Sequence, residues 1–163
     1  PSPASTVAPA APAAASPAPL SAVGRALVAF PAPDPTAAMA GALSRLGFIV
    51  DQLEAGDDKL LRLQQGDYAI VASTRNGVPE ERNAYRIVQM LAPEIRRRVF
   101  LVLVGDELQT GEGIQAFALA ADLVVHPKDA PQCDRLLAQS LHERRRLYQT
   151  YWDAEDRKME GKL

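Results

Sequence analysis

Few side chains in this sequence could carry out chemistry. The soft metal ligands are His126, His142 and Cys133. Because they form no CxxC, HxxxH or HExxH spacing, we expect no metal site. A GxSxG elbow, which would mark a serine nucleophile, is also missing. The residues predict no catalytic centre, so we expect a protein that is not an enzyme and needs no cofactor.

Polar residues do follow three of the apolar runs. Ser73, Thr74 and Asn76 come after the run at 68–72, Asp106 after 99–104, and His126 after 123–125. If these runs are parallel strands, their carboxyl ends meet along one edge, where such sheets bind ligands. These five residues could bind a small ligand. They could equally be loop and sheet-end residues with no ligand at all.

The glycine-containing loop at 105–113 is a weak candidate for binding phosphate. It has neither the GxxxxGK[ST] nor the GxGxxG arrangement, and its three acidic residues would repel an anion. We therefore do not expect a nucleotide there.

Charge and composition exclude several classes of partner. The net charge of −2 gives no general attraction to nucleic acid or to anionic lipid. The basic clusters at 96–98 and 144–146 are interpreted as solvated helix faces or helix ends. No stretch is long and apolar enough to span a membrane, and we expect no signal peptide, because the first residues lack a charged region followed by an apolar run. With a single cysteine, the sequence predicts a cytoplasmic protein that binds neither nucleic acid nor membrane.

The first 24 residues differ from the rest. They contain six prolines and nine alanines and no charged residue. Such a composition predicts a disordered, semi-stiff linker. Because a tether needs something at its other end, we expect the chain to be a piece of a longer protein. Residues 25–152 would form one domain, and residues 153–163 a charged tail that frays.

The domain alternates strands with helices. Strands are predicted at 25–30, 48–53, 68–72, 99–104 and 123–125, and helices at 34–46, 57–65, 80–91, 114–121 and 131–152. Asp34, before Pro35, is the expected N-cap of the first helix. Strands that are apolar throughout need helices on both faces, and the crossovers must be right-handed. The sequence thus predicts an α/β fold, a doubly wound five-stranded parallel sheet of order 2-1-3-4-5 with an extended C-terminal helix.

This rhythm, together with the proline that follows the fifth strand at Leu123–Pro127, resembles a response-regulator receiver domain over residues 24–142. Receivers carry an acidic pair after the first strand, an aspartate ending the third, a Ser or Thr ending the fourth and a Lys ending the fifth. The corresponding residues here are Pro31-Ala32-Pro33 with Asp34, Ala72 or Ser73, Val104-Gly105, and His126.

Because all four elements differ, the resemblance implies a bacterial pseudo-receiver that serves signal transduction as a docking module. The predicted function is protein–protein interaction or regulation within a larger protein. The alternative is a flavodoxin-like domain that binds a small ligand at the carboxyl ends of its strands.

The last helix is the predicted contact surface. Receivers usually end this helix near the position of Leu141, but here a 4-3-4-3 spacing continues. The candidate interface residues are Leu137, Leu141, Tyr148, Tyr151 and Trp152. Aromatic side chains of this kind suit interfaces with another protein or with a second copy in a homodimer. They could instead fold back onto their own domain. The resemblance adds the edge at Ile114–Val125, a surface that receivers commonly use for dimers.

Overall fold

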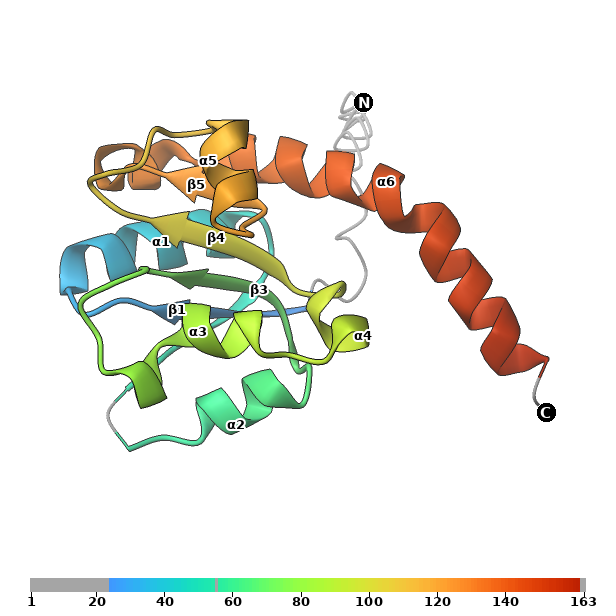
Figure 1. Ribbon diagram of the computed structural model, residues 1–163. Coiled ribbons are helices and arrows are strands. Elements are labelled where there is room, and N and C mark those ends of the chain that lie inside the picture. Colours follow the sequence, from blue (N-terminus) through green and yellow to red (C-terminus); the bar gives the residue numbers. More distant parts are fainter. Residues whose placement is uncertain (1–23, 55, 162–163) are drawn as a thin grey trace, which may run out of the picture.

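A computed structural model describes residues 24–54 and 56–161. Apart from Gly24, the predicted linker lies outside the described residues. Five parallel strands form one sheet: β1 (Arg25–Ala29), β2 (Ile49–Gln52), β3 (Tyr68–Ser73), β4 (Phe100–Val104) and β5 (Leu123–Val125). Their order is β2-β1-β3-β4-β5 (Figure 1). The predicted fold class is confirmed.

Helices cover both faces of this sheet. The α-helices are α1 (Pro33–Arg45), α2 (Lys59–Gln64), α3 (Ala84–Gln89), α4 (Pro93–Arg96), α5 (Gly113–Ala118) and α6 (Asp134–Glu160), and two 3-10 helices are η1 (Glu80–Arg82) and η2 (Pro127–Gln132). The first core cluster joins α1 and α6 to one face, and the second joins α2, α3 and α5 to the other.

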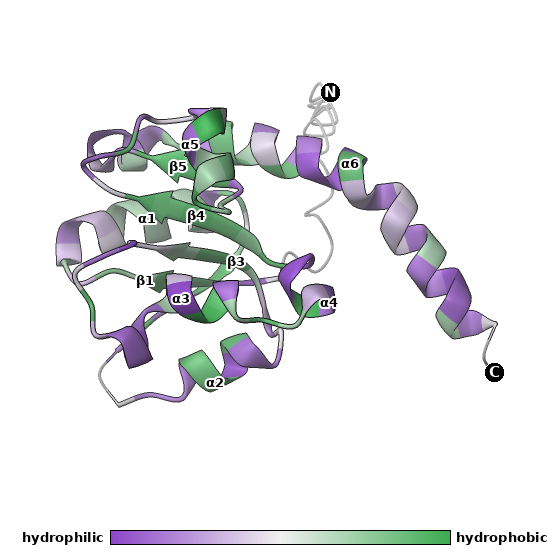
Figure 2. Cartoon of the chain, in the orientation of Figure 1, coloured by the Kyte–Doolittle hydropathy of each residue, from purple (hydrophilic) through white to green (hydrophobic). Residues whose placement is uncertain are grey.

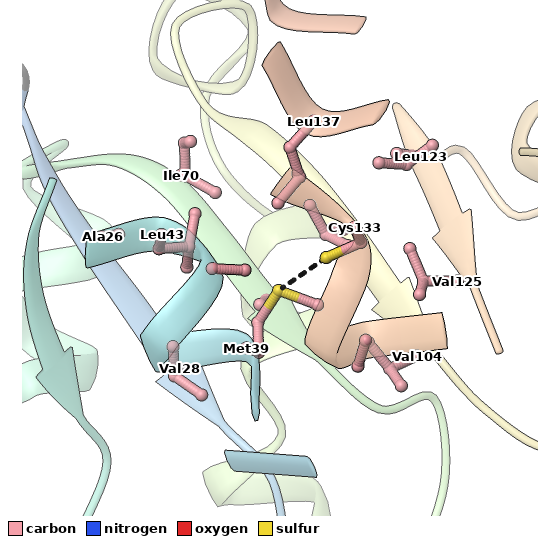
Figure 3. Close-up of a cluster of buried hydrophobic side chains, with 14 of the residues drawn as sticks. Ala26, Val28, Met39, Leu43, Ile70, Val104, Leu123, Val125, Cys133 and Leu137 are labelled. Atoms are coloured by element: carbon pink, nitrogen blue, oxygen red, sulfur yellow. Dashed lines mark hydrogen bonds between the residues drawn. The ribbon is translucent and has the colours of Figure 1, made fainter. Parts of the chain in front are cut away.

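The alternation of side chains along the strands produces the two cores. In β4, Phe100, Val102 and Val104 point towards α1 and α6, whereas Leu101 and Leu103 point towards the opposite layer. The α1–α6 core is drawn in Figure 3, where the Cys133 thiol lies 4.0 Å from the Met39 sulfur. A continuous apolar strand such as β4 is the expected result of burial on both faces.

Two helix starts differ from the sequence prediction. Helix α1 begins at Pro33, with Ala32 as its N-cap, so Asp34 lies in the first turn and is not the cap. The physical reason is that Pro33 already has the backbone angle of a first helical residue and lacks the N–H that a cap would satisfy. The predicted helix at 80–91 is divided, because Asn83 is extended and caps α3 through its side chain.

The last helix also differs at both ends. Residues 127–132 form η2, so α6 begins at Asp134 and not at Pro131, and α6 continues past Trp152 to Glu160. The final residues are good helix formers, and Asp153 receives hydrogen bonds from Gln149 and Arg157 one turn away on either side. The segment predicted to fray is therefore helical through Glu160. None of the described helices has both the length and the apolar composition needed to cross a bilayer.

Candidate functional site

At the carboxyl ends of the strands, the loops that follow β1 and β3 lie close together where the strand order reverses. The loops after β1 and β3 touch, since a Cβ placed on Gly77 would lie 3.7 Å from Cγ of Pro31. Gly77 has a φ of 90°, which lets its loop turn tightly at this point. In doubly wound sheets this is where a ligand usually enters.

The hydroxyl groups at the end of β3 are engaged within their own loop. Ser73 has no exposed surface, and its Oγ donates to the carbonyl of Thr74 at 3.1 Å. Thr74 Oγ1 donates to the carbonyl of Asn76 at 2.8 Å, and the loop is held from outside by Asn83, which donates to the carbonyl of Arg75. Of the three predicted ligand residues here, Asn76 alone presents an exposed side chain.

Negative charge lies above the end of β4. Asp106 is exposed, and the carboxylate of Glu107 folds over Gly105, so closely that a Cβ there would meet Oε2 at 2.6 Å. A phosphate brought to this position would face both carboxylates. The geometry supports the sequence argument against an anion site.

His126 stabilises the turn that follows β5. Its backbone N–H donates to Thr110 Oγ1 at 2.9 Å, and its Nδ1 accepts from the backbone N–H of Lys128 at 3.1 Å. The imidazole is therefore the N-cap of η2.

The five predicted ligand residues thus share one edge of the sheet but form no joint site among the described residues. Ser73 and Thr74 use their hydroxyls locally, His126 caps a helix, and Asp106 points to solvent. A depression of about 580 Å³ opens elsewhere, at α2 and α3, with Arg86 and Met90 in its lining. Within residues 24–54 and 56–161, no three His, Cys, Asp or Glu side chains gather as a cation site.

An apolar surface lies on α5. Ile114 and Phe117 keep 78% and 88% of their surface exposed, the largest apolar exposures on this helix. Because they are three residues apart, they share one helix face, and the exposed Ala118 adjoins it. Figure 2 shows α5 as a largely hydrophobic helix, in contrast to the hydrophilic far half of α6. We call Ile114, Phe117 and Ala118 the α5 face. The resemblance implied an edge at Ile114–Val125, but it did not single out these three side chains.

The candidate interface residues of α6 have different environments. Leu137 has no exposed surface and belongs to the α1–α6 core, so it is removed from the predicted interface. Its position on the helix face that meets the sheet explains this. Leu141 is half-buried and packs against the same core.

Arg144 attaches the next turn of α6 to the sheet. Its guanidinium lies 5.5 Å from the ring centre of Phe100 and 5.4 Å from that of Tyr148. It donates to the carbonyl of Arg97 at 2.7 Å and lies 3.6 Å from a carboxylate oxygen of Asp122. Burial lowers the pKa of Arg144, although the Asp122 carboxylate opposes the effect. The guanidinium remains charged, since an arginine does not lose its proton in a protein.

The aromatic residues beyond Arg144 also meet their own domain. The guanidinium of Arg97 lies 5.0 Å from the ring centre of Tyr151 and donates to its hydroxyl at 2.7 Å. That hydroxyl donates to Glu155, which also lies 3.6 Å from Arg98. Tyr148 stacks on Trp152, with ring centres 5.7 Å apart. Tyr151 thus folds back onto the domain, as one of the two sequence alternatives predicts, whereas Tyr148 and Trp152 make their ring contacts within α6.

Comparisons with known proteins rest on structure alone. No family model matches the sequence, and no curated protein matches it. A response regulator from Desulfuromonas acetoxidans is similar in structure, with a TM-score of 0.53 and 12% identity, over 76% of this chain and 98% of that one. The chain has a receiver-like fold. A putative pilus assembly-related protein from Burkholderia pseudomallei matches with a TM-score of 0.48 and 14% identity, over 72% of this chain and 88% of that one.

Proposed function

We propose that this receiver-like domain is a non-catalytic module that works by binding another protein. The proposal is supported by the residues that follow the strands, since they do not match those by which receivers hold their metal and phosphoryl group. The first loop is Pro31-Ala32-Pro33, β3 ends in the buried Ser73, Gly105 follows β4, and His126 stands where a receiver has lysine. Metal-assisted phosphoryl transfer needs clustered hard oxygens and a charge that offsets the phosphate, and this set provides neither.

The α5 face is the observation that carries the docking role. Two large apolar side chains on one short helix expose about four-fifths of their surface, whereas a folded protein usually buries such groups. Exposed apolar patches of this kind mark protein contacts. They lie beside β5, an edge strand of three residues.

A second copy of the chain is the simplest partner for this face. A two-fold dimer needs one self-complementary patch, and two such faces would cover Ile114 and Phe117 of each copy together. Another protein that presents an apolar surface would satisfy the same requirement.

Light scattering on the full chain tests self-association. We expect the unchanged chain to form a dimer and Phe117→Ser with Ile114→Ser to form a folded monomer, since both side chains are solvent-exposed in the monomer. Leu147→Ser is the matched control, because Leu147 is also exposed, at 75%, but lies on α6. If the unchanged chain and both variants are monomers, the homodimer is refuted. If the α5 variant is still a dimer, the dimer interface does not include the α5 face.

A second experiment tests the absence of phosphoryl transfer. We expect no mass increase after incubation with a small phosphodonor and Mg²⁺, under conditions that fully modify a phosphorylatable receiver. An adduct that is labile to hydroxylamine, as an acyl phosphate is, would contradict the non-catalytic proposal.

Binding of a small ligand in the crevice is the weaker proposal. It would need Asn76, Asp106 and His126 to act together, although each faces solvent or caps a turn. A shift in melting temperature with any member of a metabolite panel would support binding of a small ligand, provided that the shift disappears in Asn76→Ala.

A further inference from the structure

We propose that the far part of α6, residues 144–160, is a strap that opens from the sheet while the rest of the domain stays folded. We call this part the α6 strap. The proposal goes beyond the docking role of the α5 face, because it concerns a different helix and needs no partner. Three features of the strap support it, namely its contacts, the polar atoms that these contacts leave unsatisfied, and the course of the helix.

The apolar packing of α6 stops just before the strap. Leu137 has no exposed surface, and Leu141 packs against the same core. Among the described residues, the two core clusters include none of the strap's aromatic side chains, Tyr148, Tyr151 and Trp152. Because a helix in a protein is stabilised mainly by its packed apolar face, the strap is held less firmly than the near half of α6.

Arginine side chains hold the strap instead. Arg144 donates to the carbonyl of Arg97 at 2.7 Å, and Arg97 donates to the hydroxyl of Tyr151, also at 2.7 Å. Farther along the helix, the carboxylate of Glu155 lies 3.6 Å from Arg98, which is 59% exposed. Water satisfies the same groups when such contacts open, so each contact gives only a modest net stabilisation.

Closure of the strap leaves two polar atoms unsatisfied. Of the side-chain nitrogen and oxygen atoms that are buried within the described residues, Nε of Arg144 and Nε1 of Trp152 have no hydrogen-bond partner, and both belong to the strap. The Asp122 carboxylate, 3.6 Å away, offsets part of the desolvation cost for Arg144. In the open state water hydrates both N–H groups, so closure carries a cost that opening removes.

The strap can open without breaking the core. Figure 1 shows the last turns of α6 running beyond the edge of the sheet, whereas the near half of the helix lies along it. Leu137 and Leu141 belong to the near half, so they keep the helix in place when the strap leaves. Opening uncovers the ring of Phe100, which is 2% exposed in the closed state and lies 5.5 Å from the Arg144 guanidinium. The strap therefore controls access to an aromatic surface at the amino end of β4.

Hydrogen exchange of the Trp152 indole N–H tests the strap. Trp152 is the only tryptophan in the chain, so its indole proton gives a single NMR signal. A buried N–H exchanges with D2O only when it reaches water. We expect protection about tenfold or more below that of the Leu103 amide, which lies in the fully buried strand β4. The indole exchange should also be nearly independent of urea below the unfolding transition, because a local opening exposes little surface.

Two tyrosine variants separate local opening from global unfolding. Tyr151→Phe keeps the ring and removes the hydroxyl that contacts Arg97 and Glu155. Tyr85→Phe is the matched control, since it removes a hydroxyl that donates to the Leu119 carbonyl at 2.9 Å in the opposite layer. Tyr151→Phe should speed the indole exchange by about tenfold, because it weakens the closed state alone. Tyr85→Phe should leave the indole exchange unchanged, because its contact persists when the strap opens.

Two results would overturn the proposal. If the indole exchange depends on urea as steeply as that of the Leu103 amide, Trp152 reaches water only by global unfolding. If Tyr85→Phe speeds the indole exchange as much as Tyr151→Phe does, the strap does not open separately from the domain. Neither result bears on the α5 face, because that face is tested by the oligomeric state.

Discussion

Replacement of Arg144 tests how the far half of α6 is held to the sheet. The side chain is 11% exposed and contacts two rings, one backbone carbonyl and one carboxylate. Arg144→Ala removes all of these contacts. It leaves no isolated charge, because Asp122 keeps Arg96 at 3.6 Å and the backbone N–H of Leu101 at 2.8 Å.

The expected cost follows from these contacts. A hydrogen bond from a charged group contributes about 1.5–3 kcal/mol, and each cation–π contact adds roughly 0.5–1 kcal/mol. The desolvation of the buried guanidinium offsets part of this stabilisation, and Arg144→Ala removes that desolvation cost as well. We expect the free energy of unfolding to fall by about 2–3 kcal/mol. The melting temperature should fall by roughly 10 °C, between the sensitivities of smaller and larger domains.

Urea unfolding followed by circular dichroism measures this change. Arg145→Ala is the matched control, since Arg145 is exposed on the same turn and the two substitutions change helix propensity equally. Arg144→Met should lie between the two, because methionine restores apolar contact without the charge. If Arg144→Ala costs no more than Arg145→Ala, then the buried arginine does not hold α6 to the sheet.

Three further predictions concern single residues. Ala120 has a φ of 51°, in the left-handed region, so Ala120→Gly should raise the free energy of unfolding by about 0.5–1 kcal/mol in urea denaturation. Burial alone would raise the pKa of Asp51, but hydrogen bonds from Arg25 and Tyr68 outweigh burial and hold that pKa below its usual value. The contribution of Asp51 to the free energy of unfolding is therefore complete above the unfolded pKa of 3.8, and it is lost as the pH falls through the lower folded pKa. In acid unfolding curves, Asp51→Asn should flatten this dependence of stability on pH. Burial raises the pKa of the Cys133 thiol to about 11, so a thiol reagent at neutral pH should label it only after unfolding, and fast labelling of the native protein would refute its burial.

The sheet could be predicted from the sequence because its signals are local. Continuous apolar runs between turn residues set the strands, and β5 has the predicted bounds, Leu123–Val125. The doubly wound parallel arrangement followed from the rule on crossovers, which needs no knowledge of side-chain contacts, and the order is that of the common flavodoxin-like sheet. The helix ends were harder to predict, because the apolar pattern does not reveal them. The side chain of Asn83 caps α3, and Pro33 starts α1 without a side-chain cap.

The surfaces were less predictable because they depend on contacts between distant residues. The spacing of Leu137, Tyr148 and Tyr151 shows that they share a helix face, but not what meets that face. Leu137 meets the core, and Tyr151 meets Arg97, which is 54 positions away in the chain. Arg144 illustrates the same limit, since an arginine within a basic cluster was expected to be solvated and is instead buried between two rings.

The α1–α6 core has a consequence for biosynthesis. It joins Ala26 and Val28, near the start of the domain, to Cys133 and Leu137, near its end. A ribosome adds about 5–20 residues per second, so the apolar face of β1 stays uncovered by α6 for on the order of ten seconds during synthesis. The nascent chain must be kept from aggregating during that interval, and the completion of its fold is delayed until α6 has left the exit tunnel.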